Sequence, residues 1–573
     1  MTLFHDTPLR PIRRLLIANR GEIALRILRA CRDEGISPIA VYADPDRDAL
    51  FVRAADEAHA LQGSSPAETY LNIDKLIAIA RSNGADAVHP GYGFLSENAA
   101  FARAVQEAGL IWIGPDPSVI DRLGDKLAAR ALAQSVGAPL AAGSPGPVTA
   151  IEARAFAETH GLPVILKAAH GGGGRGMKVV WRLEELDDLH ASATREAQLA
   201  FGRSEVFVEQ FLTRPRHIEA QVLADQHGTV KVLGTRDCSL QRRNQKLVEE
   251  APAPFLPPEM RARIHRAAQA ICAKAGYSGA GTVEFLLSAN GTLSFLEVNT
   301  RLQVEHPVTE ETTGIDLVRA MIRVAQGARL MDDHTPEPRG HSIEFRINAE
   351  DPGRGFLPTP GLITRLDPPS GPGIRLDSGV ATGCIVPGDY DSLMAKLIVT
   401  GATRTEALQR AARALAEFRI EGVASTLPFH RAAITHPDFA GEFKVHTGWI
   451  ETEGPLIAPA PRVTPASAAP LIRLAIELDG KRHELGLPPG LLTAAPVSAP
   501  PEPEPDGVTA PVSGRLTLWL VDDGAAVQPG DAIAVMEAMK METRIEAPAA
   551  GRITRLAEAG TVLAQGAALA RIG

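Results

Sequence analysis

The sequence predicts a multidomain protein with α/β and α+β domains and a small all-β barrel near its C-terminal end. Three observations lead to this fold class. Residues 12–123 alternate short apolar strands with helices, the pattern of a parallel sheet. Residues 124–330 mix strands and helices around a glycine-rich run, and residues 338–452 form a third globular stretch. Residues 507–573 contain two copies of one β unit.

The first domain opens with an apolar strand at residues 14–18, and a helix is expected from Asn19 onward. A second strand follows at residues 38–42, which completes a βαβ pattern. No GxGxxG motif follows the first strand, so a dinucleotide site is not indicated. Further on, the glycines of the segment 91–98 permit a tight loop that presents Tyr92.

The glycine-rich run of the second domain follows an apolar strand and Lys167. Glycines let backbone N–H groups approach phosphate oxygens, and Lys167 adds a positive charge. The order GK[ST] is missing, which excludes a P-loop NTPase. Such a loop alone is also typical of lids and turns, so it needs support from other residues.

That support comes from three oxygen-bearing side chains downstream. Glu297 and Asn299 stand two residues apart in an expected strand, so they share one face. Glu284 lies in what we expect to be the neighbouring strand. Carboxylate and amide oxygens in this arrangement suit Mg²⁺ or Mn²⁺ that bridges nucleotide phosphates. The sequence therefore predicts a metal site formed by Glu284, Glu297 and Asn299.

Residues 453–506 form a linker rich in proline and alanine. Within it, apolar and polar residues alternate on both sides of Asp479-Gly480, which predicts a hairpin. The stretch 496–505 is proline-rich, and we expect it to be extended and semi-rigid.

The C-terminal segment contains an internal repeat, in which residues 510–517 match residues 547–554. Two β units of this size predict a small barrel with pseudo-twofold symmetry. Between the units lies Met539-Lys540-Met541, which places Lys540 on an exposed hairpin tip. Paired methionines at an exposed turn are unusual enough to indicate a function.

Composition narrows the functional classes. The 573-residue chain has a net charge of −9, which argues against a nucleic-acid-binding surface. No apolar run approaches the roughly 20 residues that span a bilayer, and the first residues lack the apolar core of a signal peptide. The four cysteines are far apart, so we expect buried, reduced thiols. We therefore expect a cytoplasmic protein that binds neither nucleic acid nor membrane.

Two long motifs carry a family resemblance. Residues 236–246 and 297–307 are similar to biotin carboxylases, and Ala538-Met539-Lys540-Met541 resembles the biotinyl domain of biotin-dependent carboxylases. The chain thus resembles a fusion of biotin carboxylase and biotin carboxyl carrier, the α subunit of acetyl- or propionyl-CoA carboxylases. This resemblance implies a pre-ATP-grasp parallel-sheet domain (12–123), an ATP-grasp domain with a glycine-rich lid (124–330), a carboxylase C-terminal domain (338–452) and a biotinyl barrel (507–573).

The resemblance also implies roles for individual residues. Glu305 would be the general base for bicarbonate, and Arg346 would stabilise charge on the ureido oxygen of biotin. Lys246 and Arg301 would complete the catalytic set, with Arg301 offering a planar fork to the bicarbonate anion. Bicarbonate and biotin would also contact Gln303, Val304 and Tyr92, and biotin would be attached to Lys540. The residues implied to contact ATP are Lys126, Lys167, Gly172, Gly173, Gly174, Met177, Glu209, Leu212, His217 and Gln241.

Two positions depart from the family pattern. Gln210 stands where lysine is common, and Asn244 stands where some relatives carry histidine. We expect the change to Gln210 to have little effect, because backbone atoms make many of the contacts with adenine there. Asn244 cannot serve as a titratable neighbour of phosphate.

By the same resemblance, ATP and bicarbonate would form carboxyphosphate, and its CO₂ would carboxylate biotin on the chain's own carrier domain. No carboxyltransferase domain fits in the remaining residues, so we expect a separate carboxyltransferase β subunit as a partner. The resemblance also implies a biotin protein ligase that modifies Lys540, and a homodimeric carboxylase core within a larger hetero-oligomer. The sequence leaves the acyl group open among acetyl-, propionyl- and methylcrotonyl-CoA.

Two other functions stay open at this point. The chain could be an ATP-grasp ligase that acts on another carboxylate or amine, or a non-catalytic carrier or scaffold. The second alternative requires lost catalytic side chains, yet Lys246, Glu305 and Arg346 are all present.

Overall fold

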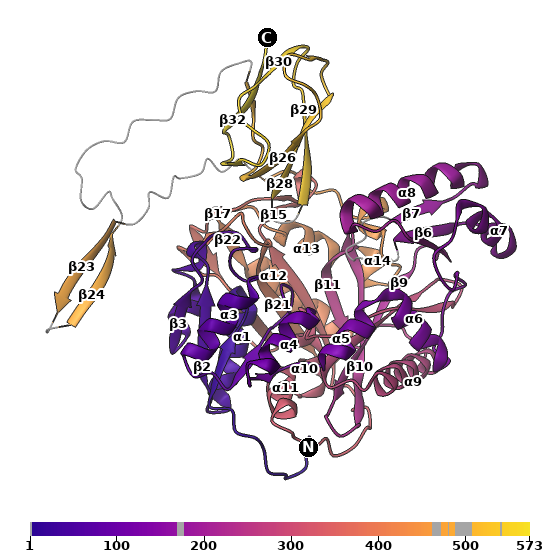
Figure 1. Ribbon diagram of the computed structural model, residues 1–573. Helices are drawn as coiled ribbons and strands as arrows, with labels where there is room; N and C mark the ends of the chain where they lie inside the picture. Colours follow the sequence, from indigo (N-terminus) through magenta and orange to yellow (C-terminus); the bar gives the residue numbers. More distant parts are fainter. Residues whose placement is uncertain (1–2, 169–176, 461–471, 479–480, 488–506, 539–540) are drawn as a thin grey trace.

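The computed structural model describes residues 3–168, 177–460, 472–478, 481–487, 507–538 and 541–573 (Figure 1). Several predicted features lie outside these residues. They are the glycines Gly172, Gly173 and Gly174, the hairpin turn Asp479-Gly480, the proline-rich stretch 496–505, and Lys540.

The N-terminal region folds around a five-stranded parallel sheet in the order β3-β2-β1-β4-β5, as the βαβ pattern predicts. Its strands are β1 (Arg14–Ile17), β2 (Ser37–Tyr42), β3 (Glu57–Ala60), β4 (Ala87–His89) and β5 (Ile111–Trp112). The helices are α1 (Gly21–Asp33), α2 (Leu50–Ala54), α3 (Ile73–Ser82), α4 (Ala99–Glu107) and α5 (Pro117–Gly124). Buried Leu15 and Ile17 alternate with Leu16 toward two separate core clusters, so both faces of the sheet are covered.

A small three-stranded antiparallel sheet, ordered β7-β6-β8, projects from one side of the body with two helices (Figure 1). It contains β6 (Val164–Ala168), β7 (Met177–Val180), β8 (Val206–Gln210), α7 (Ala150–His160) and α8 (Leu186–Phe201), and α6 (Lys126–Ser135) precedes it in the chain. The segment with the glycine-rich run connects β6 to β7.

The centre of the molecule is one antiparallel sheet of eight strands, ordered β13-β12-β9-β10-β11-β14-β21-β19. Its strands are β9 (Arg216–Ala224), β10 (Val230–Arg242), β11 (Gln245–Ala251), β12 (Gly279–Leu287), β13 (Leu293–Asn299), β14 (His341–Asn348), β19 (Ile374–Ser378) and β21 (Leu393–Gly401). The sheet crosses from residues 124–330 into residues 338–452, because β11 pairs with β14 and places Glu249 opposite Glu344. The two stretches that the sequence separates therefore share one sheet.

Helices and short strands surround this sheet. The helices are α9 (Pro258–Ala275), α10 (His306–Thr313), α11 (Leu317–Ala325), α12 (Arg404–Glu417), α13 (Leu427–Ala433), α14 (Pro437–Ala440) and α15 (Trp449–Thr452). Short strands form three two-stranded pairs, β15 (Glu350–Asp351) with β16 (Leu357–Pro358), β17 (Gly361–Leu362) with β20 (Ile385–Val386), and β18 (Arg365–Asp367) with β22 (Arg419–Glu421).

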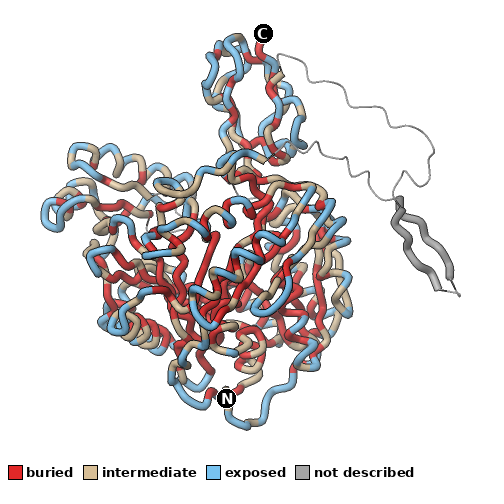
Figure 2. The backbone as a smooth tube through the Cα atoms, turned by 180° about the vertical axis from the view of Figure 1, so that it is seen from behind, coloured by how far each residue is buried: buried red, intermediate tan, exposed pale blue. Residues whose placement is uncertain are grey.

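Buried residues concentrate along the central strands (Figure 2). Many of them are charged, and Glu219, Arg236, Glu249, Glu344 and Lys396 each have a relative exposure of 0%. Charged side chains are almost never fully buried unless they are paired. Their concentration on one sheet therefore indicates a functional site there.

The C-terminal barrel lies at one end of the body and consists of two four-stranded sheets, β25-β32-β30-β27 and β29-β28-β26-β31 (Figure 1). Its strands are β25 (Gly507–Thr509), β26 (Gly514–Trp519), β27 (Ala526–Val527), β28 (Ala532–Ala538), β29 (Met541–Glu546), β30 (Gly551–Arg555), β31 (Val562–Leu563) and β32 (Ala568–Ile572). The two repeat copies supply β26 to one sheet and β30 to the other, which agrees with the predicted twofold arrangement. In the linker, β23 (Ile472–Leu478) pairs antiparallel with β24 (Lys481–Leu487).

The four cysteines, all in the described part of the chain, are free thiols. Cys384 is only partly buried, where the sequence analysis expects all four to be buried. Among the described helices, none combines the length and apolar character that a membrane span requires.

Candidate active site

The site is centred on Glu305, which immediately precedes α10. Glu305 has a relative exposure of 1%. Oε1 accepts a hydrogen bond from Lys246 Nζ at 2.7 Å, and Oε2 accepts one from Arg346 Nη2 at 3.0 Å. Burial acts to raise the pKa of Glu305, but the two cations outweigh burial and hold that pKa below its ordinary value. Glu305 is therefore an ionised carboxylate that can accept a proton.

Lys246 projects from β11 between three carboxylates. Its Nζ contacts Glu219, lies 3.1 Å from Glu284 Oε1 and contacts Glu305. Burial lowers the pKa of Lys246, yet the neighbouring negative charges more than compensate and raise it well above its usual range. The ammonium group thus stays charged although it is inside the protein.

Arg346 on β14 uses both sides of its guanidinium. Nε donates to Glu249 Oε1 at 2.6 Å, while Nη2 donates to Glu305. Burial raises the pKa of Glu249 to about 7, against the opposing charge of Arg346. Within the described residues, neither oxygen of neighbouring Glu344 has a hydrogen-bond partner, and burial raises its pKa well above the ordinary value. Arg346 therefore lies among three carboxyl groups, and burial favours the protonated form of two of them, Glu249 and Glu344.

The predicted metal ligands converge between β12 and β13. Glu284 is directly opposite Glu297 in the antiparallel register. Burial and then the charge of Glu284 raise the pKa of Glu297, so the two carboxylates repel each other across the strand pair. A divalent cation would relieve this repulsion, and the two residues therefore fit such an ion. Asn299 donates from Nδ2 to Glu284 Oε1 at 2.6 Å, while its Oδ1 accepts from Arg301 at 2.8 Å.

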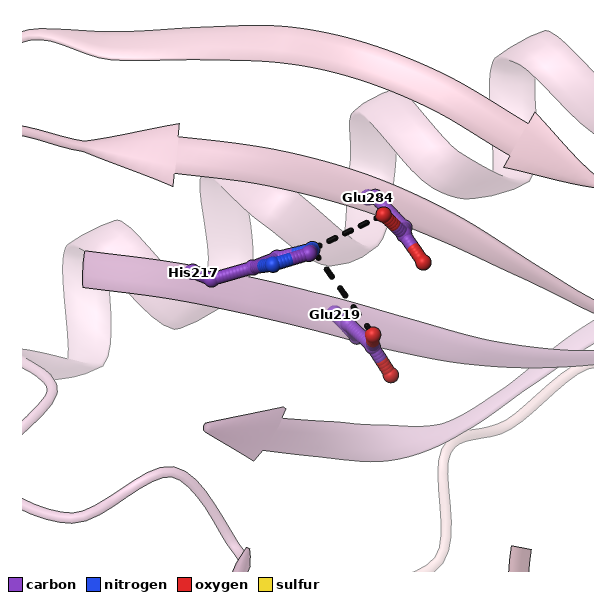
Figure 3. Close-up of side chains that lie close together, drawn as sticks. All are labelled: His217, Glu219 and Glu284. Carbon is purple, nitrogen blue, oxygen red and sulfur yellow. Dashed lines mark hydrogen bonds and ion pairs between the residues drawn. The ribbon is translucent and has the colours of Figure 1, made fainter. Parts of the chain in front are cut away.

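Figure 3 shows a second arrangement around Glu284 that the sequence analysis missed in part. His217 Nε2 lies 2.8 Å from Glu284 Oε2 and 3.7 Å from Glu219 Oε1. Burial lowers the pKa of His217, but the charge of Glu284 reverses this and raises it above the ordinary value. Glu219 stands two residues after His217 on β9 and so shares its face, a spacing that could have revealed it.

Within the described residues, those implied to contact ATP lie on α6, on or just after strands of the small sheet, and on β9 and β10 of the central sheet. Lys167 Nζ lies 2.5 Å from Glu209 Oε2, and Arg130 of α6 pairs with the other oxygen of Glu209. Burial lowers the pKa of Lys126, which also faces Lys167 and the opposing charge of Glu297. Arg130 was not among the sequence-predicted residues, and its place on α6 one turn after Lys126 is the signal that could have identified it.

Three further residues that are predicted to contact ATP lie in the described part of the chain. Met177 lies opposite Lys167 in the β6–β7 register, and Leu212 is buried just after β8. Gln241 Nε2 on β10 lies 3.3 Å from Nδ1 of His217 on the neighbouring strand β9.

The residues predicted to hold bicarbonate follow β13. Arg301 donates from Nε to Glu97 Oε2 at 3.0 Å, and Gln303 donates from Nε2 to Glu284 Oε1 at 2.8 Å. The carbonyl oxygen of Val304 accepts from Lys396 Nζ at 2.7 Å. Glu97 belongs to the loop of residues 91–98, so this loop reaches the cradle.

Tyr92 lies at the start of that loop, and its hydroxyl donates to Glu22 of α1. The loop is held by Asn19, whose Nδ2 donates to the carbonyl oxygens of Pro90 at 2.7 Å and Tyr92 at 2.8 Å. A Cβ atom at Gly91 would meet Asn19 Nδ2 at 2.9 Å and φ is +64°, so glycine is required there.

Arg236 binds several residues of the site. The sequence predicted no role for it. It is fully buried on β10. Its guanidinium donates to Glu219 Oε2 at 3.1 Å and to Gln303 Oε1 at 2.5 Å, and to the side chains of Gln221, Thr282 and Thr309. Such a fully bonded arginine fixes the positions of its partners.

Four protein-family models match the chain. They are "Biotin carboxylase, N-terminal domain" over residues 11–120, "Carbamoyl-phosphate synthase L chain, ATP binding domain" over 125–333, "Biotin carboxylase C-terminal domain" over 344–452 and "Biotin-requiring enzyme" over 506–572. The ATP-binding and biotin-requiring models confirm ATP and biotin as the cofactors that the sequence predicts.

Curated relatives agree with these matches. The chain is 54% identical over 590 residues to the biotin-dependent acyl-coenzyme A carboxylase alpha3 subunit of Mycobacterium leprae, and the alignment covers 98% of both chains. It is 50% identical over 440 residues to the biotin carboxylase of Nostoc, which covers 76% of this chain and 98% of that protein. It is also 48% identical over 436 residues to one subunit of the pyruvate carboxylase of Methanothermobacter thermautotrophicus, which covers 76% of this chain and 89% of that protein.

Solved structures extend the likeness to the fold. A complex of biotin carboxylase with β,γ-ATP from Campylobacter jejuni has a TM-score of 0.75 and 43% identity, and covers 77% of this chain and 99% of its own. The biotin carboxylase domain dimer of the Hydrogenobacter thermophilus 2-oxoglutarate carboxylase, in complex with MgADP, ADP and bicarbonate, has a TM-score of 0.74 and 43% identity over 78% of this chain and 98% of its own. The chain therefore belongs to the biotin-dependent carboxylases, as a biotin carboxylase with a fused biotin carrier domain that carboxylates biotin.

Proposed function

We propose that this chain is the α subunit of an acyl-CoA carboxylase and that it passes carboxybiotin to a separate carboxyltransferase. The observation that carries the chemical part is the position of Glu305 between Lys246 and Arg346, beside the facing carboxylates of Glu284 and Glu297. The place of the chain in such a complex is supported by the 98% coverage of the Mycobacterium leprae relative, which includes the carrier region.

In this proposal, Glu305 removes the proton from bicarbonate as an oxygen of bicarbonate attacks the γ-phosphorus of ATP and ADP leaves. The low pKa of Glu305 keeps its carboxylate ionised before bicarbonate binds. Lys246 and Arg301 orient the bicarbonate anion. Carboxyphosphate then splits into CO₂ and phosphate, and the phosphate takes the N1′ proton of the biotin ring.

Arg346 supplies fixed positive charge where the ureido oxygen of biotin would lie. Biotin, when bound at Lys540, supplies the ureido nitrogen that takes up the carboxyl group. Glu284 and Glu297 would hold Mg²⁺ or Mn²⁺, which neutralises phosphate charge. The predicted ATP residues, from Lys126 to Gln241, would position ATP on the small sheet.

The test is transfer of labelled bicarbonate to the carrier domain. Wild-type protein that has been biotinylated by a biotin protein ligase should incorporate label in the presence of ATP and Mg²⁺. Lys540→Arg should incorporate none, while it still hydrolyses ATP with free biotin. Label on the Lys540→Arg protein would contradict the assignment of the attachment residue.

The acyl acceptor is the second part of the proposal. We expect the isolated chain to carboxylate no acyl-CoA until its carboxyltransferase partner is added, and then to act on acetyl- or propionyl-CoA. Pyruvate is the control acceptor, because one of the similar proteins is part of a pyruvate carboxylase. Carboxylation of pyruvate but of no acyl-CoA by the reconstituted complex would overturn the acyl-CoA assignment.

A further inference from the structure

One buried lysine contacts the active site from outside both long motifs. Lys396 lies on β21 and has a relative exposure of 0%. It is directly opposite Arg346 on β14 and Asp377 on β19, so it shares a sheet face with the catalytic arginine. A fully buried lysine requires compensation by partners, and these partners are informative.

Its two direct contacts belong to different parts of the chain. Nζ donates to the carbonyl oxygen of Val304 at 2.7 Å and forms an ion pair with Glu22 Oε1 at 3.1 Å. Val304 immediately precedes Glu305, and Glu22 belongs to the first helix. Lys396 thus joins the C-terminal region of the body to the bicarbonate cradle and to the N-terminal domain.

The contact with Glu22 extends to the biotin side of the site. The same Oε1 atom of Glu22 accepts the hydroxyl of Tyr92, and Lys396 Nζ lies 6.0 Å from the centre of the Tyr92 ring. Glu22 Oε2 is buried and has no hydrogen-bond partner in the described part of the chain. The charge of Glu22 therefore depends on Lys396, and the position of Tyr92 depends on Glu22.

The charge state of Lys396 is compatible with this arrangement. Burial lowers its pKa, but the negative charges of Glu22, Glu344 and Asp377 outweigh burial and raise it above the ordinary value. An ammonium group at this place always offers donors, so the hydrogen bond to Val304 persists through the working pH range.

We propose that Lys396 is a positioning residue for carboxylation: it holds the main chain of Val304, and with it Glu305, in the geometry that receives bicarbonate, and it couples this cradle to Tyr92 through Glu22. The proposal rests on the proposed place of Val304 in the bicarbonate site. It assigns no role toward ATP, because neither Val304 nor Glu22, the two direct partners of Lys396, is among the residues predicted to contact ATP.

The experiment compares steady-state kinetics of Lys396→Met with those of the wild type, in bicarbonate-dependent ATP hydrolysis with free biotin. Activity of the wild type in this assay establishes the function first, so failure of the function and failure of this proposal are distinguishable. A shift of the cradle by a fraction of an ångström should raise KM for bicarbonate and lower kcat, each by about tenfold or more. KM for ATP should stay within about twofold of wild type.

Two further variants separate positioning from folding. Glu22→Gln with Lys396→Met removes both charges, so it should fold better than Lys396→Met alone and should still show the raised KM for bicarbonate. Lys231→Met is the matched control, since Lys231 is 8% exposed on β10 and pairs with Asp332 far from the cradle. It should leave both KM values unchanged.

Three results would overturn the proposal. One is a wild-type KM for bicarbonate in folded Lys396→Met or in the double variant. Another is an equal rise of KM for ATP and KM for bicarbonate. The third is failure of Lys396→Met and of the double variant to fold while Lys231→Met folds normally. This result would assign Lys396 to stability instead.

Discussion

The central sheet of the body and the C-terminal barrel are both β structures, but they bury different kinds of side chain. The core of the barrel consists of apolar residues such as Leu516, Ile533 and Ile553. The sheet of the body buries Glu219, Arg236 and other charges on the face that carries the site. The candidate catalytic side chains of the body are therefore buried inside the fold. The functional lysine of the barrel, in contrast, is predicted to lie on a hairpin tip outside the core.

This difference has an energetic consequence. Removal of one member of a buried ion pair leaves an uncompensated charge, which costs more than the pair contributed. Removal of an apolar side chain leaves a cavity and no charge. Changes in the body should thus affect stability and chemistry together, whereas changes in the barrel core should destabilise the carrier and leave the chemistry of the body unchanged.

The largest effect is expected from Arg236→Met. The variant leaves Glu219 and Gln303 without their common donor, and the body should lose about 3–5 kcal/mol of stability together with carboxylase activity. Urea denaturation followed through the body is the measurement. The matched barrel variant is Arg555→Met, whose partly exposed guanidinium stacks on Trp519, and it should lose only about 1 kcal/mol or less. Equal losses of stability in the two variants would contradict the proposed difference between the body and the barrel.

Leu516→Ala tests the barrel from its core. Leu516 is fully buried on β26, so a cavity should cost the barrel about 2–5 kcal/mol. Modification of Lys540 by biotin ligase should fall, because the ligase must recognise a folded carrier. Bicarbonate-dependent ATP hydrolysis with free biotin should be unchanged. Loss of that hydrolysis would show that the barrel and the body do not act as separate units.

A smaller effect is expected for two adjacent carboxylates of β11, which differ in pKa. The pKa of Glu250 falls to about 2 because hydrogen bonds from His341 and Arg404 outweigh burial, whereas burial raises the pKa of Glu249 to about 7. Ionised Glu250 stabilises the fold above about pH 4.5, and this stability is lost as pH falls toward 2. Protonated Glu249 gives a stability that is present below about pH 4.5 and lost as pH rises through 7.

Melting temperatures from pH 2 to 8 check both signs, because the Glu250 change lies below pH 4.5 and the Glu249 change lies above it. Glu249→Gln should lose less stability than wild type as pH rises from 5 to 8. Glu250→Gln should be destabilised throughout the neutral range, and it should lose less further stability than wild type on acidification. A Glu249→Gln variant that is less stable than Glu250→Gln at neutral pH would contradict the pKa assignments.

The sequence predicted the parts of the site that lie in continuous motifs. Lys246 and Glu305 come from the two long motifs, Arg346 comes from the family resemblance, and the structure places both cations within hydrogen-bond distance of Glu305. The sequence also predicted that Glu284 lies on the strand next to that of Glu297 and Asn299, and the register of β12 and β13 places Glu284 directly opposite Glu297. The repeat predicted the two-sheet barrel for a similar reason, since a local pattern determines a local fold.

The missed features depend on strand order. Nothing in the local pattern of β11 specifies β14, almost a hundred residues later, as its neighbour, so one shared sheet was not foreseen. Glu219 and Lys396 lie outside the motifs, and only the sheet brings them to Lys246 and Val304. The glycine-rich run and Lys540 lie outside the described residues, so their roles stay predictions.

The central claim is that the buried charges around Glu305 perform the carboxylation chemistry. The most direct measurement is ATP hydrolysis with bicarbonate and free biotin, for wild type and Glu305→Gln. We predict biotin-stimulated hydrolysis that requires bicarbonate in the wild type and a loss of about 10²-fold or more in Glu305→Gln, because a general base contributes that much. A folded Glu305→Gln protein with wild-type hydrolysis, or a wild type that biotin does not stimulate, would contradict the account.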